Sequence, residues 1–180
     1  MIDYNLLNKA IDFYSEKGYQ RIEVPWMVTE EVDSITRPKD VKPFVVNEKN
    51  KNLIASGEQG FLYLMMKGQL PPGKYQTLTP CFRNDIHDFE HSKQFMKIEL
   101  INTISIVEGI SEIMSASLEF FETIFDLKDL KFILNGNTEY DINFKDIELG
   151  SYGYRKYKHL EWIYGTGLAE PRTSRIIKQI

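Results

Sequence analysis

The chain has 180 residues, of which 42% are hydrophobic and 27% are charged, a balance typical of a globular protein and not of a disordered one. We therefore predict a single domain over residues 1–180, long enough to bury a real core. Acidic residues exceed basic residues by 26 to 22, for a net charge of −4, which argues against a protein that holds nucleic acid unaided through many phosphate contacts.

Cysteine content and hydropathy exclude further classes. Cys81 is the only cysteine, so the chain can form no internal disulfide and no thiolate metal cluster. The sequence contains no apolar signal core and no apolar run long enough to span a membrane. We therefore expect a cytoplasmic protein with no membrane partner.

The first third of the chain predicts two helices and a long loop. Apolar residues recur at helical spacing over residues 1–19, and Gly18 is a natural stop. Residues 21–28 are typical of a short strand, which Pro25 interrupts, as at an edge or an interface. Residues 33–52 predict a long loop with a small strand at 43–46. A second helical stripe follows in residues 57–70, and "PPG" ends it.

The remainder is richer in strands. Two strands flank the loop that follows Arg83, and residues 105–127 form an amphipathic helical pattern. Three alternating stretches follow at 131–137, 139–146 and 147–154, with Asn-Gly as turn chemistry. The end predicts a glycine turn running into a short helix. Because hairpins dominate, the predicted fold is α+β, with helices packed on a mostly antiparallel sheet.

The hairpin at residues 75–100 carries the first candidate site. Arg83 follows one strand, and the pattern His91-x-x-x-Phe95 opens the next. A guanidinium binds phosphate oxygens through its planar fork, and an aromatic ring on the neighbouring strand can stack on a purine. The plainer interpretation is that Arg83 pairs with Asp85 or Asp88, Phe95 is a core residue and His91 is solvated.

The second candidate is "GTGLAEPRT". Gly165 and Gly167 allow close backbone approach and positive φ values, and Pro171 suits the first turn of a helix. Arg172 at that helix start would make an anion site. The alternative is an ordinary glycine turn with a solvent-exposed arginine.

The third candidate is a pair of oxygen donors, Glu148 and Ser151, near the end of a predicted strand. A carboxylate and a hydroxyl could hold Mg²⁺ against phosphates, because this ion takes few protein ligands and keeps substrate oxygens and waters. Glu148 on a solvated strand face is the alternative.

Taken together, these stretches resemble the catalytic domain of a class II aminoacyl-tRNA synthetase, most closely the seryl type, over nearly the whole chain. "GYQRIEVPWMV" resembles the first family motif, "TPCFRND…HSKQFMKIEL" the second and "GTGLAEPRT" the third. Each motif is degenerate alone, but their order, spacing and context agree. The resemblance implies the class II catalytic fold and an ATP-dependent ligase that forms an aminoacyl-adenylate.

By matching position, the resemblance implies an ATP site. Arg83 would bind the α-phosphate, Phe95 would stack on adenine, and Asp85 would lie near the adenine amino group. His91 would contact the γ-phosphate end, and Arg172 would hold the γ-phosphate from the other face. Arg83 and Arg172 would thus be catalytic. Asp85 stands where the family has glutamate.

The same matching implies a metal and an amino-acid subsite. Glu148 and Ser151 match the spacing of the Mg²⁺ ligands of the seryl type. "ASGEQ" resembles the segment that places Ser56 and Glu58 near the amino group of the substrate. Glu99 falls where those enzymes read the substrate side chain, which indicates a small polar side chain by analogy.

The sequence allows several acceptors for the activated amino acid and several forms of assembly. The loop between Arg83 and His91 is short, and we expect no anticodon-binding domain and no N-terminal arm. The activated amino acid could pass to a carrier protein, a small molecule or a tRNA, with a partner supplying recognition. A non-catalytic paralogue that senses nucleotide or amino acid, or serves as a regulatory subunit, is the alternative. Pro25 in the first motif predicts a homodimer.

Overall fold

The computed structural model describes residues 1–39, 41–46, 50–84, 92–136 and 138–179. Its helices are α1 (Tyr4–Glu16), α2 (Glu30–Thr36), α3 (Gly57–Met66), α4 (Ile106–Glu122), α5 (Arg172–Ile177) and a 3-10 turn, η1 (Leu127–Asp129). Its strands are β1 (Gln20–Arg21), β2 (Met27–Thr29), β3 (Val45–Val46), β4 (Lys51–Leu53), β5 (Lys74–Phe82), β6 (Gln94–Asn102), β7 (Leu130–Asn135), β8 (Glu139–Phe144), β9 (Ile147–Tyr157) and β10 (Leu160–Glu170). No helix within these ranges is long and apolar enough to cross a membrane.

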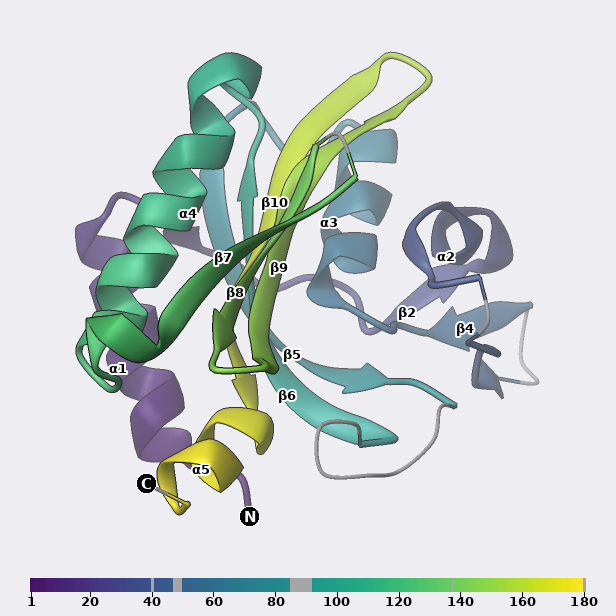
Figure 1. The fold of residues 1–180 in the computed structure, drawn as a ribbon. Helices are drawn as coiled ribbons and strands as arrows, with labels where there is room; N and C mark the ends of the chain where they lie inside the picture. Colours follow the sequence, from purple (N-terminus) through teal and green to yellow (C-terminus); the bar gives the residue numbers. More distant parts are fainter. Residues whose placement is uncertain (40, 47–49, 85–91, 137, 180) are drawn as a thin grey trace.

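A seven-stranded sheet in the order β1-β5-β6-β10-β9-β8-β7 forms the centre of the fold (Figure 1). Every pairing in it is antiparallel except that of β1 with β5. A small antiparallel sheet, β2-β4-β3, lies to one side. The prediction of an α+β fold with a mostly antiparallel sheet is therefore confirmed.

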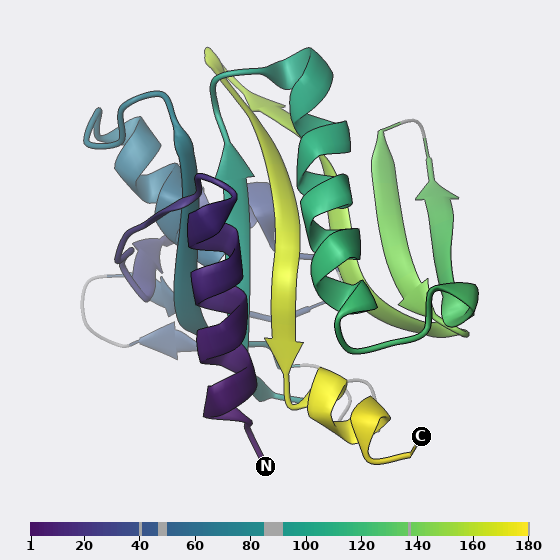
Figure 2. The ribbon, with the colours of Figure 1, turned by 90° about the vertical axis from the view of Figure 1, so that its left-hand side faces the viewer.

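One face of the large sheet is covered by α1 and α4, which lie side by side across it (Figure 2). Asp3 caps helix α1, because its carboxylate accepts hydrogen bonds from the backbone N–H groups of Asn5 and Leu6. Leu7 and Tyr14 on α1 pack with Phe121 on α4 in one buried apolar cluster. This core packs against one face of β6, β9 and β10, and the candidate site lies on the other face of these three strands.

The opposite face is only partly covered, because α3 packs on one end of it (Figure 1). Phe61 and Leu62 of α3 join Ile101 of β6 and Trp162 of β10 in a second buried cluster. The rest of this face is left to the polar side chains of the candidate site.

The predicted loop over residues 33–52 is partly wrong, because α2 occupies its first residues. The hydroxyl of Thr29 accepts from the backbone N–H of Val32, 3.5 Å away, which caps the helix. Glu30, Glu31 and Asp33 lie in the first turn, where acidic side chains favour a helix start. The small strand predicted at 43–46 is confirmed as β3.

The strand predicted at residues 21–28 divides into two strands of different sheets. β1 pairs with β5, whereas β2 pairs with β4. Pro25 lies between them, outside both strands. A proline lacks the N–H that a continuing strand would need to donate, so the chain changes sheets there.

The predicted glycine turn before the last helix is wrong, because residues 165–170 belong to β10. Neither Gly165 nor Gly167 is among the glycines with positive φ. Both are instead needed for close packing. A Cβ on Gly165 would lie 2.4 Å from Ile113, and one on Gly167 would lie 2.8 Å from Tyr14.

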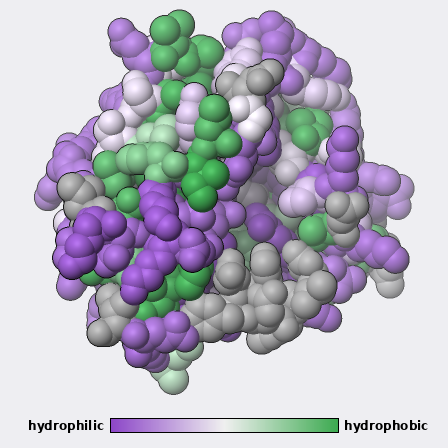
Figure 3. Space-filling model, viewed as in Figure 1, coloured by the Kyte–Doolittle hydropathy of each residue, from purple (hydrophilic) through white to green (hydrophobic). Residues whose placement is uncertain are grey.

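Exposed apolar side chains gather over β7 and the start of α4 (Figure 3). Phe132 and Leu134 on β7 are 52% and 60% exposed, and Val107 on α4 is 91% exposed. Because β7 ends the large sheet, its outer backbone edge is also available for pairing.

A buried polar network joins α2, α3 and the small sheet. The Asp33 carboxylate accepts from both Nε and Nη2 of Arg37, each at 2.7 Å. It also accepts from Asn52 at 2.9 Å and from Gln59 at 2.8 Å. The side chains of Asp33 and Arg37 are only 3% and 6% exposed.

We predict that Asp33→Ala lowers the free energy of unfolding by about 3–5 kcal/mol, because it leaves a buried guanidinium without its counter-charge. Urea unfolding would measure the change. Glu31→Ala is the matched control on the same helix: its partner Lys158 is exposed, so we expect a much smaller change. Equal effects of the two substitutions would contradict a dominant role for the buried pair.

Candidate active site

Strand β6 places three side chains of the candidate site on one face of the large sheet. Phe95, Lys97 and Glu99 alternate with Ile98 and Leu100, which pack in the core beneath α1 and α4. Side chains two apart on a strand point to the same face. The prediction that Phe95 and Glu99 belong to one site therefore fits the strand geometry.

Two β-bulges place residues three apart on that same face. In β9, Ile142 pairs with Gly150 and Asn143 with Glu148, so Leu149 is the extra residue. The bulge reverses the alternation, and Glu148 and Ser151 both line the cavity. They lie in the first half of β9, not near its end as predicted.

The bulge in β10 has the same effect. Register shifts between Thr166 and Leu168, which makes Gly167 the extra residue. Thr166 and Ala169 therefore both face the cavity, and the chain reaches Arg172 on the same side of the sheet.

These strands, with α3 and the start of α5, enclose a cavity of about 220 Å³. Its lining includes seven of the predicted site residues: Ser56, Glu58, Arg83, Phe95, Glu148, Ser151 and Arg172. Glu99 is fully buried and contacts the lining residues Ser56 and Lys97. Asp85 and His91 lie outside the described residues. The other eight predicted residues therefore lie together in or beside this cavity. The roles assigned to them remain predictions.

Arg83 and Phe95 meet at one end of the cavity. The Arg83 Nε donates to the backbone oxygen of Ala55 at 3.1 Å, and its guanidinium carbon lies 5.0 Å from the centroid of the Phe95 ring. Both contacts hold the guanidinium at the rim of β5. An arginine fixed in this way is suited to bind an anion.

Arg172 and Glu148 meet at a second wall. Nη2 of Arg172 donates to Glu148 at 3.2 Å and to the backbone oxygen of Leu149 at 3.3 Å. Nε of Arg172 is buried and has no hydrogen-bond partner among the described residues. The Glu148 side chain is 40% exposed, so its carboxylate can reach a ligand in the cavity.

The donor set at this wall fits Mg²⁺. Glu148 and Ser151 offer hard oxygen atoms on one face of β9, and Mg²⁺ accepts few protein ligands when phosphates supply others. No cluster of three or more histidine, cysteine or acidic residues that could hold a metal occurs in the described part of the chain. A metal here would therefore depend on substrate oxygens.

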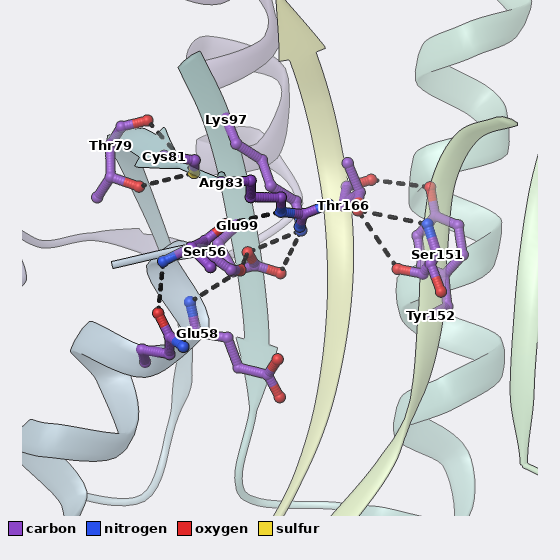
Figure 4. A network of polar contacts seen from close by, with 12 residues as sticks. Ser56, Glu58, Thr79, Cys81, Arg83, Lys97, Glu99, Ser151, Tyr152 and Thr166 are labelled. Atoms are coloured by element: carbon purple, nitrogen blue, oxygen red, sulfur yellow. Dashed lines mark hydrogen bonds and ion pairs between the residues drawn. The ribbon is translucent and has the colours of Figure 1, made fainter. Parts of the chain in front are cut away.

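The inner end of the cavity holds two ion pairs, and Figure 4 shows the first, between Lys97 and Glu99. Nζ of Lys97 lies 3.0 Å and 2.8 Å from the two carboxylate oxygens of Glu99, and the hydroxyl of Ser56 donates to the same carboxylate. Ser56 also caps α3 by accepting from the backbone N–H of Glu58 at 3.3 Å. One hydroxyl thus joins a helix end to the buried carboxylate.

The second pair joins Glu58 and Arg155. The carboxylate accepts from Arg155 Nη1 and, through its other oxygen, from the indole N–H of Trp162, both at 2.7 Å. The Arg155 guanidinium carbon lies 4.3 Å from the centroid of the Tyr164 ring. Burial raises the pKa of Glu58, and the charge of Arg155 opposes that rise.

Cys81 lies beside this network and is unsuited to be a nucleophile. It is fully buried, and burial raises the pKa of its thiol to about 11. The thiol is therefore protonated at neutral pH.

Lys97, Arg155, Tyr164 and Thr166 line the cavity but were not among the predicted residues. The alternation from Phe95 through Lys97 to Glu99 could have identified Lys97. Arg155 stands in "YGYRKYK", which looks like a solvated strand end. Its role depends on long-range pairing with Glu58, for which the local pattern holds no signal.

Comparisons with known proteins agree with this geometry. The family model for tRNA synthetases class II (D, K and N) matches residues 1–161. A serine–tRNA ligase of Sulfurisphaera tokodaii is 30% identical over 115 residues, covering 53% of this chain and 25% of that protein. The chain thus matches only about a quarter of this curated relative.

Solved structures share the fold at lower identity. The cytoplasmic serine–tRNA ligase of Naegleria fowleri, solved with AMP, superposes with a TM-score of 0.72 at 22% identity, covering 94% of this chain and 52% of that one. The seryl-tRNA synthetase of Pyrococcus horikoshii, solved with ATP, gives 0.75 at 19%, covering 97% and 49%. A pyrrolysyl-tRNA synthetase of Desulfitobacterium hafniense gives 0.76 at 13%, covering 98% and 69%. With its fold, cavity and family match in agreement, the chain belongs to the class II tRNA synthetases.

Proposed function

We propose that this chain activates an amino acid with ATP, forming an aminoacyl-adenylate that passes to an acceptor. One observation carries the proposal: Arg83 and Arg172, from distant parts of the chain, line one cavity whose inner end holds carboxylates. The relatives solved with AMP and ATP support a nucleotide as the ligand. A cytoplasmic location is part of the same proposal.

The reaction needs alignment and charge neutralisation more than covalent help from the protein. A carboxylate oxygen of the amino acid attacks the α-phosphorus of ATP, the bond from that phosphorus to the bridging oxygen breaks, and pyrophosphate leaves. Arg83 would neutralise charge on the α-phosphate while Phe95 stacks on the base. Arg172 would hold the γ-phosphate so that the leaving group is in line.

The remaining predicted residues complete the site. Glu148 and Ser151 would hold Mg²⁺, which would neutralise phosphate charge when bound. Ser56, Glu58 and Glu99 would surround the amino-acid end. The ion pair between Arg172 and Glu148 has to open or share its oxygens when a triphosphate binds. Asp85 and His91 keep the nucleotide roles that the family resemblance implies.

We predict amino-acid-dependent exchange of pyrophosphate into ATP, and a drop on the order of 10²–10³ in that rate for Arg172→Ala, because one preorganised charge donor is lost. Exchange across the common amino acids would measure both. Lys178→Ala, at the exposed end of the same helix, is the control and should leave the rate unchanged. ATP binding without exchange for any amino acid would contradict activation and favour a nucleotide-sensing or regulatory paralogue.

The acceptor is the second part of the proposal. With a net charge of −4 and a short second-motif loop, we predict weak or absent charging of tRNA by this chain. Transfer of a radiolabelled amino acid to tRNA should be compared with transfer to carrier-protein thiols and small amines. Efficient charging of tRNA by the isolated chain would contradict this prediction and make tRNA the acceptor.

We also propose a homodimer through the first-motif segment. Trp26 and Met27 are 55% and 44% exposed, as expected of side chains that a partner covers. Light scattering should show a dimer that Trp26→Glu dissociates. Phe132→Glu, an equally exposed aromatic on β7, should leave the dimer intact. A monomeric parent chain would refute the dimer, and dissociation only by Phe132→Glu would move the interface to β7.

A further inference from the structure

Two buried tyrosine hydroxyls contact the β-bulge of β10. Tyr14 of α1 donates to the backbone oxygen of Gly167 at 2.9 Å, and Tyr152 of β9 donates to that of Thr166 at 2.8 Å. Both tyrosines are fully buried in the apolar cluster that α1 and α4 form with the sheet. The two acceptors are consecutive residues, and Gly167 is the extra residue of the bulge. Each of these two carbonyl groups therefore has a tyrosine donor in the core.

These contacts lie where the ladder between β9 and β10 ends. The last backbone pair of the two strands is Gly165 with Tyr152. Beyond it, the hydroxyl of Thr166 accepts from the backbone N–H of Ser151 at 3.3 Å and donates to the backbone oxygen of Ser151 at 3.4 Å (Figure 4). The place of β10 beside β9 therefore depends here on side-chain hydrogen bonds.

The chain from the bulge to Arg172 is short and is held by further hydrogen bonds. The backbone oxygen of Ala169 accepts from the Thr173 hydroxyl at 3.0 Å. The Glu170 carboxylate accepts from the backbone N–H and the hydroxyl of Ser174 at 3.0 and 2.6 Å. Helix α5 is thereby attached to the end of β10, and Arg172 is its first residue. A shift of the bulge would consequently move the guanidinium that lines the cavity.

Burial alone does not give a tyrosine of this core a hydrogen bond. The Tyr19 ring lies 6.2 Å from the Tyr14 ring between centroids, and its buried hydroxyl has no hydrogen-bond partner among the described residues. Burial raises the pKa of Tyr14 and Tyr152, so both keep the proton that they donate. Because a bulge locally disrupts the ladder, these two donors stabilise backbone that the sheet holds less firmly.

We propose that Tyr14 and Tyr152 are positioning residues, which hold Arg172 through the bulge of β10 where the terminal phosphates of ATP bind. Their role rests on the proposed function, in which Arg172 holds the γ-phosphate. The tyrosines themselves would not touch the nucleotide, because both are buried in the core cluster.

Calorimetry with ATP and with AMP, both in the presence of Mg²⁺, tests this role without requiring turnover. Tyr14→Phe/Tyr152→Phe removes the two hydroxyls and keeps both rings. We expect this double variant to bind ATP about 10-fold more weakly, as when lost hydrogen bonds misplace one charged contact. AMP binding should not change, because AMP lacks the phosphates that Arg172 would hold.

Tyr19→Phe is the matched control, because it deletes a buried hydroxyl without a hydrogen bond from the same core. It should leave the binding of both nucleotides unchanged. In an Arg172→Ala background, the two tyrosine substitutions should weaken ATP binding no further, because the hydroxyls act through Arg172. In pyrophosphate exchange, the double variant should lower kcat more than it raises the KM for the amino acid, whose predicted subsite is at the inner end of the cavity.

The outcomes separate this role from a general loosening and from the proposed function. Equal weakening of ATP and AMP, or a folded double variant that binds ATP as the parent does, would overturn it. If circular dichroism shows the double variant unfolded, the single variants are measured, and at least one must show the difference between ATP and AMP. Selective loss of ATP binding without exchange for any amino acid would overturn the activation and support the positioning role. A parent chain that binds no ATP would overturn both.

Discussion

The pairing of buried charges is the constraint on which this structure depends. Glu58, Glu99 and Asp33 are all nearly inaccessible to solvent, and a carboxylate is stable there only with a counter-charge and hydrogen-bond donors. Two of these carboxylates form the inner end of the cavity, and the third joins α2 to α3. The same requirement therefore supports both the scaffold and the site.

Strand geometry decides which charges can meet. Simple alternation brings Lys97 and Glu99 to one face of β6, but it would have separated Glu148 from Ser151. The extra residue Leu149 brings Glu148 and Ser151 to the same face of β9. The extra residue Gly167 does the same for Thr166 and Ala169 in β10. Bulges are over-represented next to active sites because they re-aim side chains, and both bulges have that effect here.

The sequence predicted most of the fold and much of the site for identifiable reasons. Helices α1 and α4 have strong apolar periodicity, α3 is apolar over most of its second half, and Arg83, Phe95 and Arg172 stand in recognisable motifs. Helix α2 was missed because a polar, proline-bounded stretch looks like a loop, although Thr29 and three acidic residues marked its start. Gly165 and Gly167 suggested a turn, because tight packing against Ile113 and Tyr14 is invisible in the local sequence.

Arg155 shows what local patterns cannot supply. Its partner Glu58 is 97 residues away, and the two meet because β9 pairs with β10 and α3 packs against β10. Removing either charge would expose the other to the desolvation that the pair now offsets. A chain that replaced Arg155 would consequently also have to replace Glu58, and with it the acceptor for the indole N–H of Trp162.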